Sequence, residues 1–151
     1  MKRTYIITLL FCLCSLVTYA QDSFFDKFAD MDEVTSVYIS KAMLSLMPDM
    51  KAEGVNIGGV ASKLDNIQIL SCENPAVIAK LKKELQYISP KNGYEELMRV
   101  NSEGEKTTIY LKQKKGEKKE FVLINSEEDE FTVIVITGDL SLEEMKGIVN
   151  K

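Results

Sequence analysis

Apolar residues are most concentrated near the end of the chain. Residues 131–136 are apolar on both faces of a strand and rich in β-branched side chains, which is typical of a central strand covered on both sides. A turn follows, and Ser141 with Glu144 three residues later forms a capping box that begins a helix. Leu140 and Met145 occupy the hydrophobic-staple positions of that helix. The pattern predicts a buried strand that leads into a capped helix.

Three more strands are predicted immediately before this one. Residues 94–100, 107–112 and 120–124 have the composition of strands, and short polar segments connect them to one another and to the strand at 131–137. Connections of this length suit β-hairpins. The four strands are therefore predicted to form an antiparallel meander.

Helices and strands alternate in the first part of the chain. Residues 34–39 and 64–72 are predicted strands because of their β-branched and apolar content. Asn74 caps the clearest helix, and Pro75 takes its first position. The apolar stripe of that helix consists of Val77, Ile78, Leu81, Leu85 and Ile88.

Two shorter helices are predicted from the spacing of large apolar residues. Residues 21–31 form the first, and the second ends or bends at Pro48. Residues 54–59 contain three glycines and are predicted to form a flexible loop. The apolar faces of the two helices consist of Phe24, Phe25 and Phe28, and of Met43, Leu44, Met47 and Met50.

This order of elements predicts an α+β domain. We expect a mainly antiparallel sheet with a C-terminal four-stranded meander, and helices packed on one face of that sheet. Residues 21–151 are long enough for a single α+β domain with its own core and too few for two.

Residues 1–20 have the pattern of a signal peptide. Lys2 and Arg3 precede a mostly apolar segment, and Thr18 and Ala20 are the small residues that a signal peptidase reads. We expect cleavage after Ala20 and a periplasmic or secreted protein, with an uncleaved anchor as the alternative. The apolar segment is interrupted and short for a bilayer, so no stable membrane span is expected after cleavage.

Removal of the signal peptide changes both charge and cysteine content. It takes away Lys2 and Arg3 but no acid, so the net charge falls from −4 to −6. Nucleic acid is therefore not an expected partner, since phosphate binding needs concentrated positive charge. Cys72 remains as the one cysteine, which excludes an internal disulfide.

The chain contains no histidine. This excludes the usual serine and cysteine triads and the common zinc sites. Cys72 stands just before the helix at Pro75, where a helix N-terminus can lower a thiol pKa. A buried packing role is preferred to a reactive or intermolecular thiol, because no basic neighbour supports a nucleophile.

Three other patterns have a structural and a functional interpretation. Met43, Met47 and Met50 could bind a soft ion such as Cu(I), but core packing is preferred. The acidic residues 127–130 lack the spacing of a calcium loop and indicate a solvated turn. The glycine-rich residues 54–59 lack the Lys-Ser/Thr of a phosphate-binding loop.

A lysine cluster lies on the preceding predicted hairpin. The cluster has two interpretations. One is a contact with an acidic partner, and the other, which is preferred, is a solvated edge protected against strand pairing. No aromatic residue is interleaved to stack on bases. The cluster consists of Lys112, Lys114, Lys115, Lys118 and Lys119.

The chain resembles an exported Bacteroidetes family known only as domain of unknown function 4252. The resemblance rests on the signal ending at residues 19–21, the strand end at 69–73, and the strand, turn and capped helix at 131–144. It implies an envelope or secreted location in a Gram-negative bacterium. It brings no catalytic or binding residue.

Three classes of function remain. The first choice is an exported envelope protein that acts as a non-enzymatic protein-interaction module, with another envelope protein as partner. The alternative is a periplasmic carrier of a small apolar or lipid ligand held between sheet and helices. An enzyme is the third. No catalytic, cofactor-binding or metal-binding residue is assigned, and the oligomeric state is left open.

Overall fold

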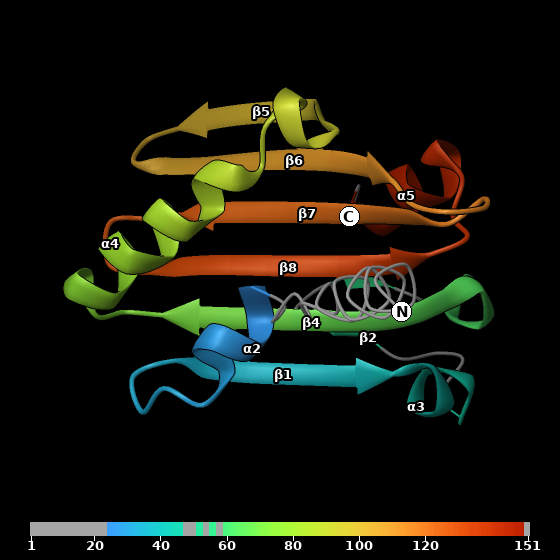
Figure 1. Ribbon diagram of the computed structural model, residues 1–151, viewed down its shortest axis with the longest axis horizontal. Helices are drawn as coiled ribbons and strands as arrows, with labels where there is room; N and C mark the ends of the chain where they lie inside the picture. The colour runs from blue at the N-terminus through green and yellow to red at the C-terminus, as the bar shows by residue number, and fades with distance from the viewer. Residues whose placement is uncertain (1–23, 47–50, 53–54, 57–58, 150–151) are drawn as a thin grey trace, which may run out of the picture.

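The computed structural model describes residues 24–46, 51–52, 55–56 and 59–149. The predicted signal peptide and its cleavage site lie outside the described residues. Six strands form one antiparallel sheet in the order β1-β4-β8-β7-β6-β5 (Figure 1). These strands are β1 (Thr35–Ser40), β4 (Leu64–Cys72), β5 (Tyr94–Ser102), β6 (Glu105–Gln113), β7 (Lys119–Ser126) and β8 (Phe131–Gly138).

Helices and a small second sheet accompany the six-stranded sheet. The α-helices are α2 (Phe24–Ala29), α3 (Lys41–Leu46), α4 (Pro75–Glu84) and α5 (Leu142–Val149). The second sheet pairs β2 (Lys51–Ala52) with β3 (Val55–Asn56). Short 3₁₀ turns occur at Ala61–Lys63, Leu85–Tyr87 and Pro90–Asn92.

The predicted strands are all present, and the meander is confirmed as β5 to β8. The prediction of a loop over residues 54–59 is wrong at one point, because β3 is a strand paired with β2. A strand of two residues is too short for an alternation of apolar and polar residues to reveal it. The predicted cap of α4 is confirmed: the Asn74 side chain accepts hydrogen bonds from the backbone N–H groups of Ala76 and Val77.

The strand β4 joins the two parts of the chain. Ile69 pairs with Val37 of β1 on one side and with Ile134 of β8 on the other. The sheet therefore continues from the meander into the first half of the sequence, and β8 is a central strand, as its composition predicts.

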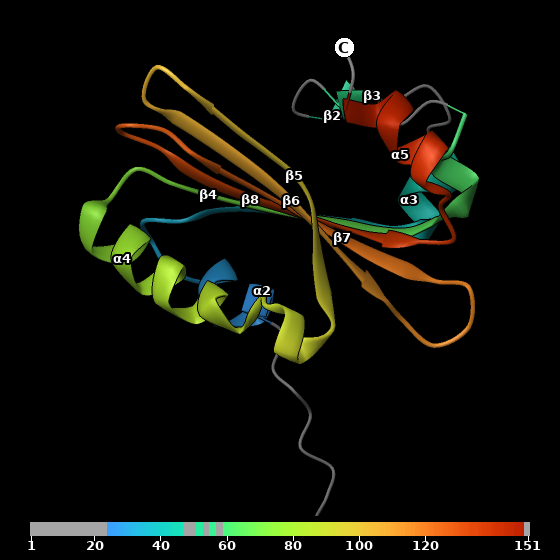
Figure 2. The ribbon, with the colours of Figure 1, turned by 90° about the horizontal axis from the view of Figure 1, so that it is seen from above.

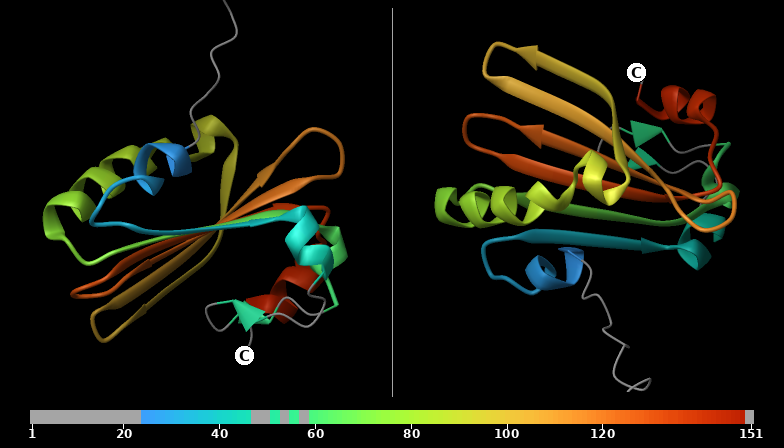
Figure 3. Two further views of the ribbon diagram at one scale, coloured as in Figure 1. Left: turned by 90° about the horizontal axis from the view of Figure 1, so that it is seen from below. Right: turned by 45° about the horizontal axis from the view of Figure 1, so that its top comes forward.

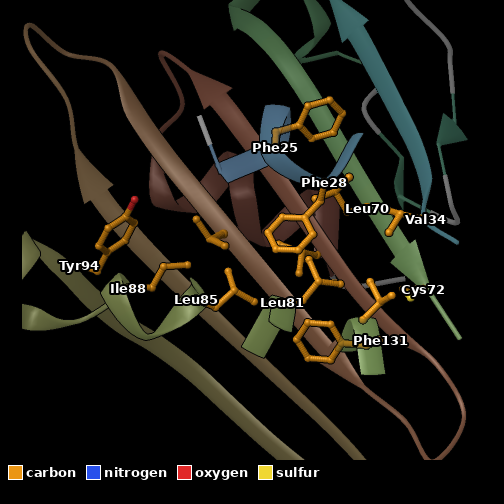
Figure 4. Close-up of a cluster of buried hydrophobic side chains, with 13 residues drawn as sticks. Phe25, Phe28, Val34, Leu70, Cys72, Leu81, Leu85, Ile88, Tyr94 and Phe131 are labelled. Atoms are coloured by element: carbon orange, nitrogen blue, oxygen red, sulfur yellow. The ribbon is translucent and has the colours of Figure 1, made fainter. Parts of the chain in front are cut away.

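One face of the sheet, which we call the α4 face, is covered by α2 and α4 (Figure 2). Alternate residues of β4, β7 and β8 point to this side, and both helices add apolar side chains to them. Figure 4 shows this cluster. Its members include Phe25, Phe28, Leu70, Cys72, Leu81, Leu85, Val122, Phe131 and Val133.

The opposite face, which we call the α5 face, holds a second buried cluster. Here α3 and α5 pack over one end of the sheet, beside the small sheet of β2 and β3 (Figures 2 and 3). The members of this cluster include Leu44, Leu64, Ile67, Phe121, Ile134, Ile136, Leu140 and Met145.

The α+β class and the antiparallel sheet are as predicted, but the helices do not all lie on one face. The physical reason is that β8 is apolar on both sides. Val133 packs on the α4 face, whereas Ile134 and Ile136 need cover on the α5 face. The capped helix α5 supplies part of that cover.

The capping box of α5 is confirmed. The backbone N–H of Ser141 donates to Glu144 Oε2 at 2.9 Å, and the backbone N–H of Glu144 donates to Ser141 Oγ at 3.2 Å. The staple residues Leu140 and Met145 are both buried in the same cluster. Local sequence signals therefore fix where α5 starts and which side it buries.

Candidate functional site

Cys72 lies in the core of the α4 face. Only 2% of it is exposed, and its Sγ lies 3.8 Å from the carbonyl oxygen of Asn74. The side chain therefore packs among apolar neighbours and is not presented to a substrate or to another thiol.

Of the three methionines considered as ligands of a soft ion, only Met43 lies within the described residues. Met43 lies on α3 and is 45% exposed, while Met47 and Met50 lie outside the described residues. Within the described residues, no group of three or more His, Cys, Asp or Glu side chains could hold a metal ion.

The acidic segment 127–130 forms the turn between β7 and β8. The backbone N–H of Glu127 donates to the carbonyl oxygen of Glu130 at 2.8 Å. The Glu130 carboxylate accepts hydrogen bonds from Ser71 Oγ at 2.5 Å and Thr132 Oγ1 at 3.2 Å. It therefore ties the turn to β4 and β8.

The lysine cluster lies on the β6–β7 hairpin, and its interpretation as edge protection is wrong. The edges of the sheet are β1 and β5, so both strands of this hairpin have neighbours. Two of the lysines make ion pairs: Lys114 Nζ lies 2.6 Å from Glu120 Oε2, and Lys118 Nζ lies 2.5 Å from Asp65 Oδ2. The first ion pair lies within the β6–β7 hairpin, and the second joins the hairpin to β4.

A buried polar network links β5 and β7. The Tyr94 hydroxyl donates to Glu120 Oε1 at 2.6 Å, and Lys112 Nζ lies 4.7 Å from the centroid of the Tyr94 ring. Burial and the hydrogen bond to Glu120 raise the pKa of Tyr94, so this phenol stays protonated and donating. Glu120 at the start of an apolar strand is the sequence signal that could have revealed this network. The contacts of this network join side chains of the same chain, so we interpret the network as structural.

An ion pair at the end of β8 supports the start of α5. Lys63 Nζ lies 2.6 Å from Glu144 Oε1. This hydrogen bond, with the one from Ser141, lowers the pKa of Glu144 to about 2. The sequence did not predict this pair, since 81 positions separate the two residues.

Two hollows at the surface of the described residues bear on a possible binding site. The first is a polar cleft of about 370 Å³ lined by residues that include Asp32, Glu33 and Glu73. The second is a groove of about 400 Å³ on the α4 face, between α4 and strands β6 to β8. Its apolar lining includes Leu85, Ile88, Ile124 and Phe131.

The strand β5 is an exposed edge of the sheet that carries apolar side chains. It is nine residues long, its outer side has no neighbouring strand among the described residues, and every residue after Tyr94 is exposed. Leu97, Met98 and Val100 are 38%, 39% and 46% exposed. The β5–β6 register shifts between Glu96 and Met98, which marks a bulge. Sequence reasoning predicted this strand but not its position at the edge.

In the described part of the chain, no helix has the length and apolarity required to cross a bilayer.

Comparison with known proteins gives one match. A family model described as "Domain of unknown function (DUF4252)" matches residues 25–148. No curated protein and no solved structure matches the chain. The match covers the sheet and both groups of helices, and it attaches no activity to any residue.

Proposed function

The chain belongs to this family of unknown function, and we propose that it is an exported, non-enzymatic envelope protein that binds a partner protein through the outer edge of β5. The observation that carries this proposal is the combination of an open strand edge with three exposed apolar side chains, Leu97, Met98 and Val100.

An open edge strand has a defined binding chemistry. Its outer N–H and C=O groups can pair with an extended segment of another chain, which then becomes an additional strand. Side chains along the edge select which segment fits. Exposed apolar edges of this length favour aggregation unless they are covered. We propose that a dedicated partner covers the β5 edge.

The other edge strand is a weaker candidate. It has six residues, and α2 and α3 both pack against it (Figure 1). Figure 3 shows β5 at the far side of the sheet, away from these helices. The free edge at β5 is therefore both longer and more open than the edge at β1.

Charges on β5 make the edge selective. Arg99 forms an ion pair with Glu96, and Glu95 is exposed beside them. Charges and bulges on an edge strand suppress indiscriminate pairing. The proposed partner is therefore an extended segment with apolar residues opposite Met98 and Val100, and with charges that complement Arg99 and the two glutamates.

The sequence contains no histidine, and several polar groups take part in structural bonds. Both observations favour a non-enzymatic role. Glu120, Glu130 and Glu144 are each engaged by neighbouring side chains in the described structure. Export is supported by the signal-like residues 1–20. Cell fractionation tests it: the mature chain should start at Gln21 in the periplasm or medium, and a full-length cytoplasmic protein would contradict export.

Replacement of Val100 by lysine tests the β5 edge. We expect Val100→Lys to abolish recovery of a cross-linked envelope partner, because it places a charge in the apolar contact. The matched control is Val37→Lys, since Val37 is also an exposed valine on an edge strand. Both variants should unfold at similar urea concentrations.

The partner recovered must then be shown to bind β5. A synthetic peptide from its cross-linked segment should protect the β5 amides from hydrogen exchange. Equal loss of the partner in both variants, or protection elsewhere in the sheet, would contradict the proposal. If the purified chain dimerises through β5, the edge is occupied by a second copy, and the proposal of a different partner is wrong.

A further inference from the structure

The groove on the α4 face changes in polarity along its length. The cross-strand register places Lys106 beside Ser126, and Ser126 beside Phe131, in a row at one end. The next row holds Thr108 and Ile124. Leu85 and Ile88 follow on the side of the helix and its 3₁₀ extension, close to Tyr110. One end of the groove is therefore cationic and hydroxyl-bearing, and the other is apolar.

Two lysines give the polar end its positive charge. Lys82 Nζ projects from α4 to 5.2 Å from the centroid of the Phe131 ring, and Lys106 stands on β6 across the groove. Within the described residues, neither lysine has a carboxylate within 4.0 Å, and no Asp or Glu lines the groove. The chain as a whole is acidic, with a net charge of −4. The charged side chains that line this groove are therefore all positive, which favours the binding of an anion.

Thr108 supplies a second, independent observation. It lines the middle of the groove and is only 5% exposed. Its hydroxyl makes no hydrogen bond within the described part of the chain, and it remains open to the groove, since no fully buried side-chain oxygen or nitrogen there lacks a partner. A threonine hydroxyl can both donate and accept a hydrogen bond. A ligand in the groove would give this hydroxyl a partner.

We infer that the groove binds a single-chain amphiphile with an anionic head group. The head group lies between Lys82 and Lys106, within reach of the Ser126 and Thr108 hydroxyls, and the acyl chain runs past Ile124 toward Leu85 and Ile88. The volume of about 400 Å³ falls at the small end of the range for small-molecule sites, which suits one chain and not a two-chain lipid. This site lies on the α4 face and does not depend on the proposed role of the β5 edge.

Calorimetric titration of the purified mature protein with decanoate tests the site. We expect decanoate to bind, decan-1-ol of the same chain length to bind at least about tenfold more weakly, and acetate not to bind, since both the charge and the chain contribute. Absence of decanoate binding, or equal binding of the alcohol, would overturn the inference.

Charge reversal locates the head group. The double variant Lys82→Glu with Lys106→Glu should weaken decanoate binding by at least about tenfold. The matched control reverses Lys80 and Lys83, which are exposed on the same helix outside the groove lining, and should change affinity by less than about twofold. Equal weakening in both double variants would show a general charge effect and overturn the site.

The uncharged substitution Thr108→Val keeps the shape of the side chain and removes the hydroxyl. It should weaken decanoate binding with little change in unfolding midpoint; unchanged binding would remove Thr108 from the site and overturn the placement of the ligand. Val100→Lys should bind decanoate normally, so the failure of one proposal is distinguishable from the failure of the other.

Discussion

Gly138 is a residue for which the structure leaves no space for a side chain. A Cβ added there would lie 2.5 Å from the carbonyl oxygen of Lys63 and 2.8 Å from Cα of Leu64. Both are backbone atoms, and β4 is held by strands on either side. The sequence predicted only a turn after residue 136, whereas the structure places Gly138 against the backbone where β4 begins.

We predict that Gly138→Ala lowers the free energy of unfolding by about 2 kcal/mol, since the backbone must move to admit the methyl group. Urea unfolding of the variant and the parent measures this difference. The exposed substitution Ser62→Ala, close to the same contact, is the control and should have little effect. Equal stability of Gly138→Ala and the parent would mean that the β8–β4 contact is looser than described.

Glu144 makes stability depend on pH. Its pKa is lowered to about 2 in the folded state from an ordinary value of 4.5, because Lys63 and Ser141 bind its charged form. A carboxyl group with a lowered pKa stabilises the fold above its unfolded pKa, and this contribution is lost as the pH falls through the folded pKa.

We therefore predict that Glu144 contributes stability at pH 7 that disappears between about pH 4.5 and about pH 2. Unfolding curves at pH 7 and across this acid range measure it. Glu144→Gln should be less stable than the parent at neutral pH and should approach it at low pH. A constant difference across the range would show that the ionised carboxylate is not the cause.

At the scale of elements, α4 is held to the sheet by one apolar stripe. Leu81 is fully buried in the cluster of the α4 face, while Ile78 is only partly buried. Leu81→Ala should lower the free energy of unfolding by about 3 kcal/mol through lost contacts and a cavity. Ile78→Val should cost about 1 kcal/mol or less. Similar losses in both variants would contradict the packing of α4 described here.

Local signals predicted most of the elements. The caps at Asn74 and Ser141 and the β-branched strands depend on residues close in sequence, so they could be recognised from the chain alone. The position of β4 between β1 and β8 could not, because strand order depends on pairing between distant segments. Non-local contacts also explain why Tyr94–Glu120 and Lys63–Glu144 were missed. The two-sided placement of the helices was implied by the apolar residues on both faces of β8.

The candidate sites were less accessible to sequence analysis than the fold. The Lys82–Lys106 groove combines residues from α4 and β6, and no sequence pattern links them. The β5 edge was predicted as a strand, but an edge strand and an interior strand of a meander have the same local signals. Exposure of Leu97, Met98 and Val100 becomes visible only when the sheet order is known.

The whole molecule has two separate surfaces with proposed roles. The outer edge of β5 is open to another chain, and the groove on the α4 face is a small amphipathic hollow. The remainder of the described structure is explained by packing: two apolar clusters on opposite faces of one sheet, and ion pairs that fix the hairpin and α5. The proposed function depends on binding of a partner at the β5 edge.

Photo-cross-linking in intact cells tests whether a partner binds at this edge. A photoreactive amino acid at Met98 on β5 should form a covalent adduct with one envelope protein, because this side chain lies at the proposed contact. The same group at Leu142 on α5, which is also exposed and apolar, should form none. The predicted result is a single partner captured from position 98 alone. Adducts of equal yield from both positions, or none from position 98, would contradict partner binding at the β5 edge.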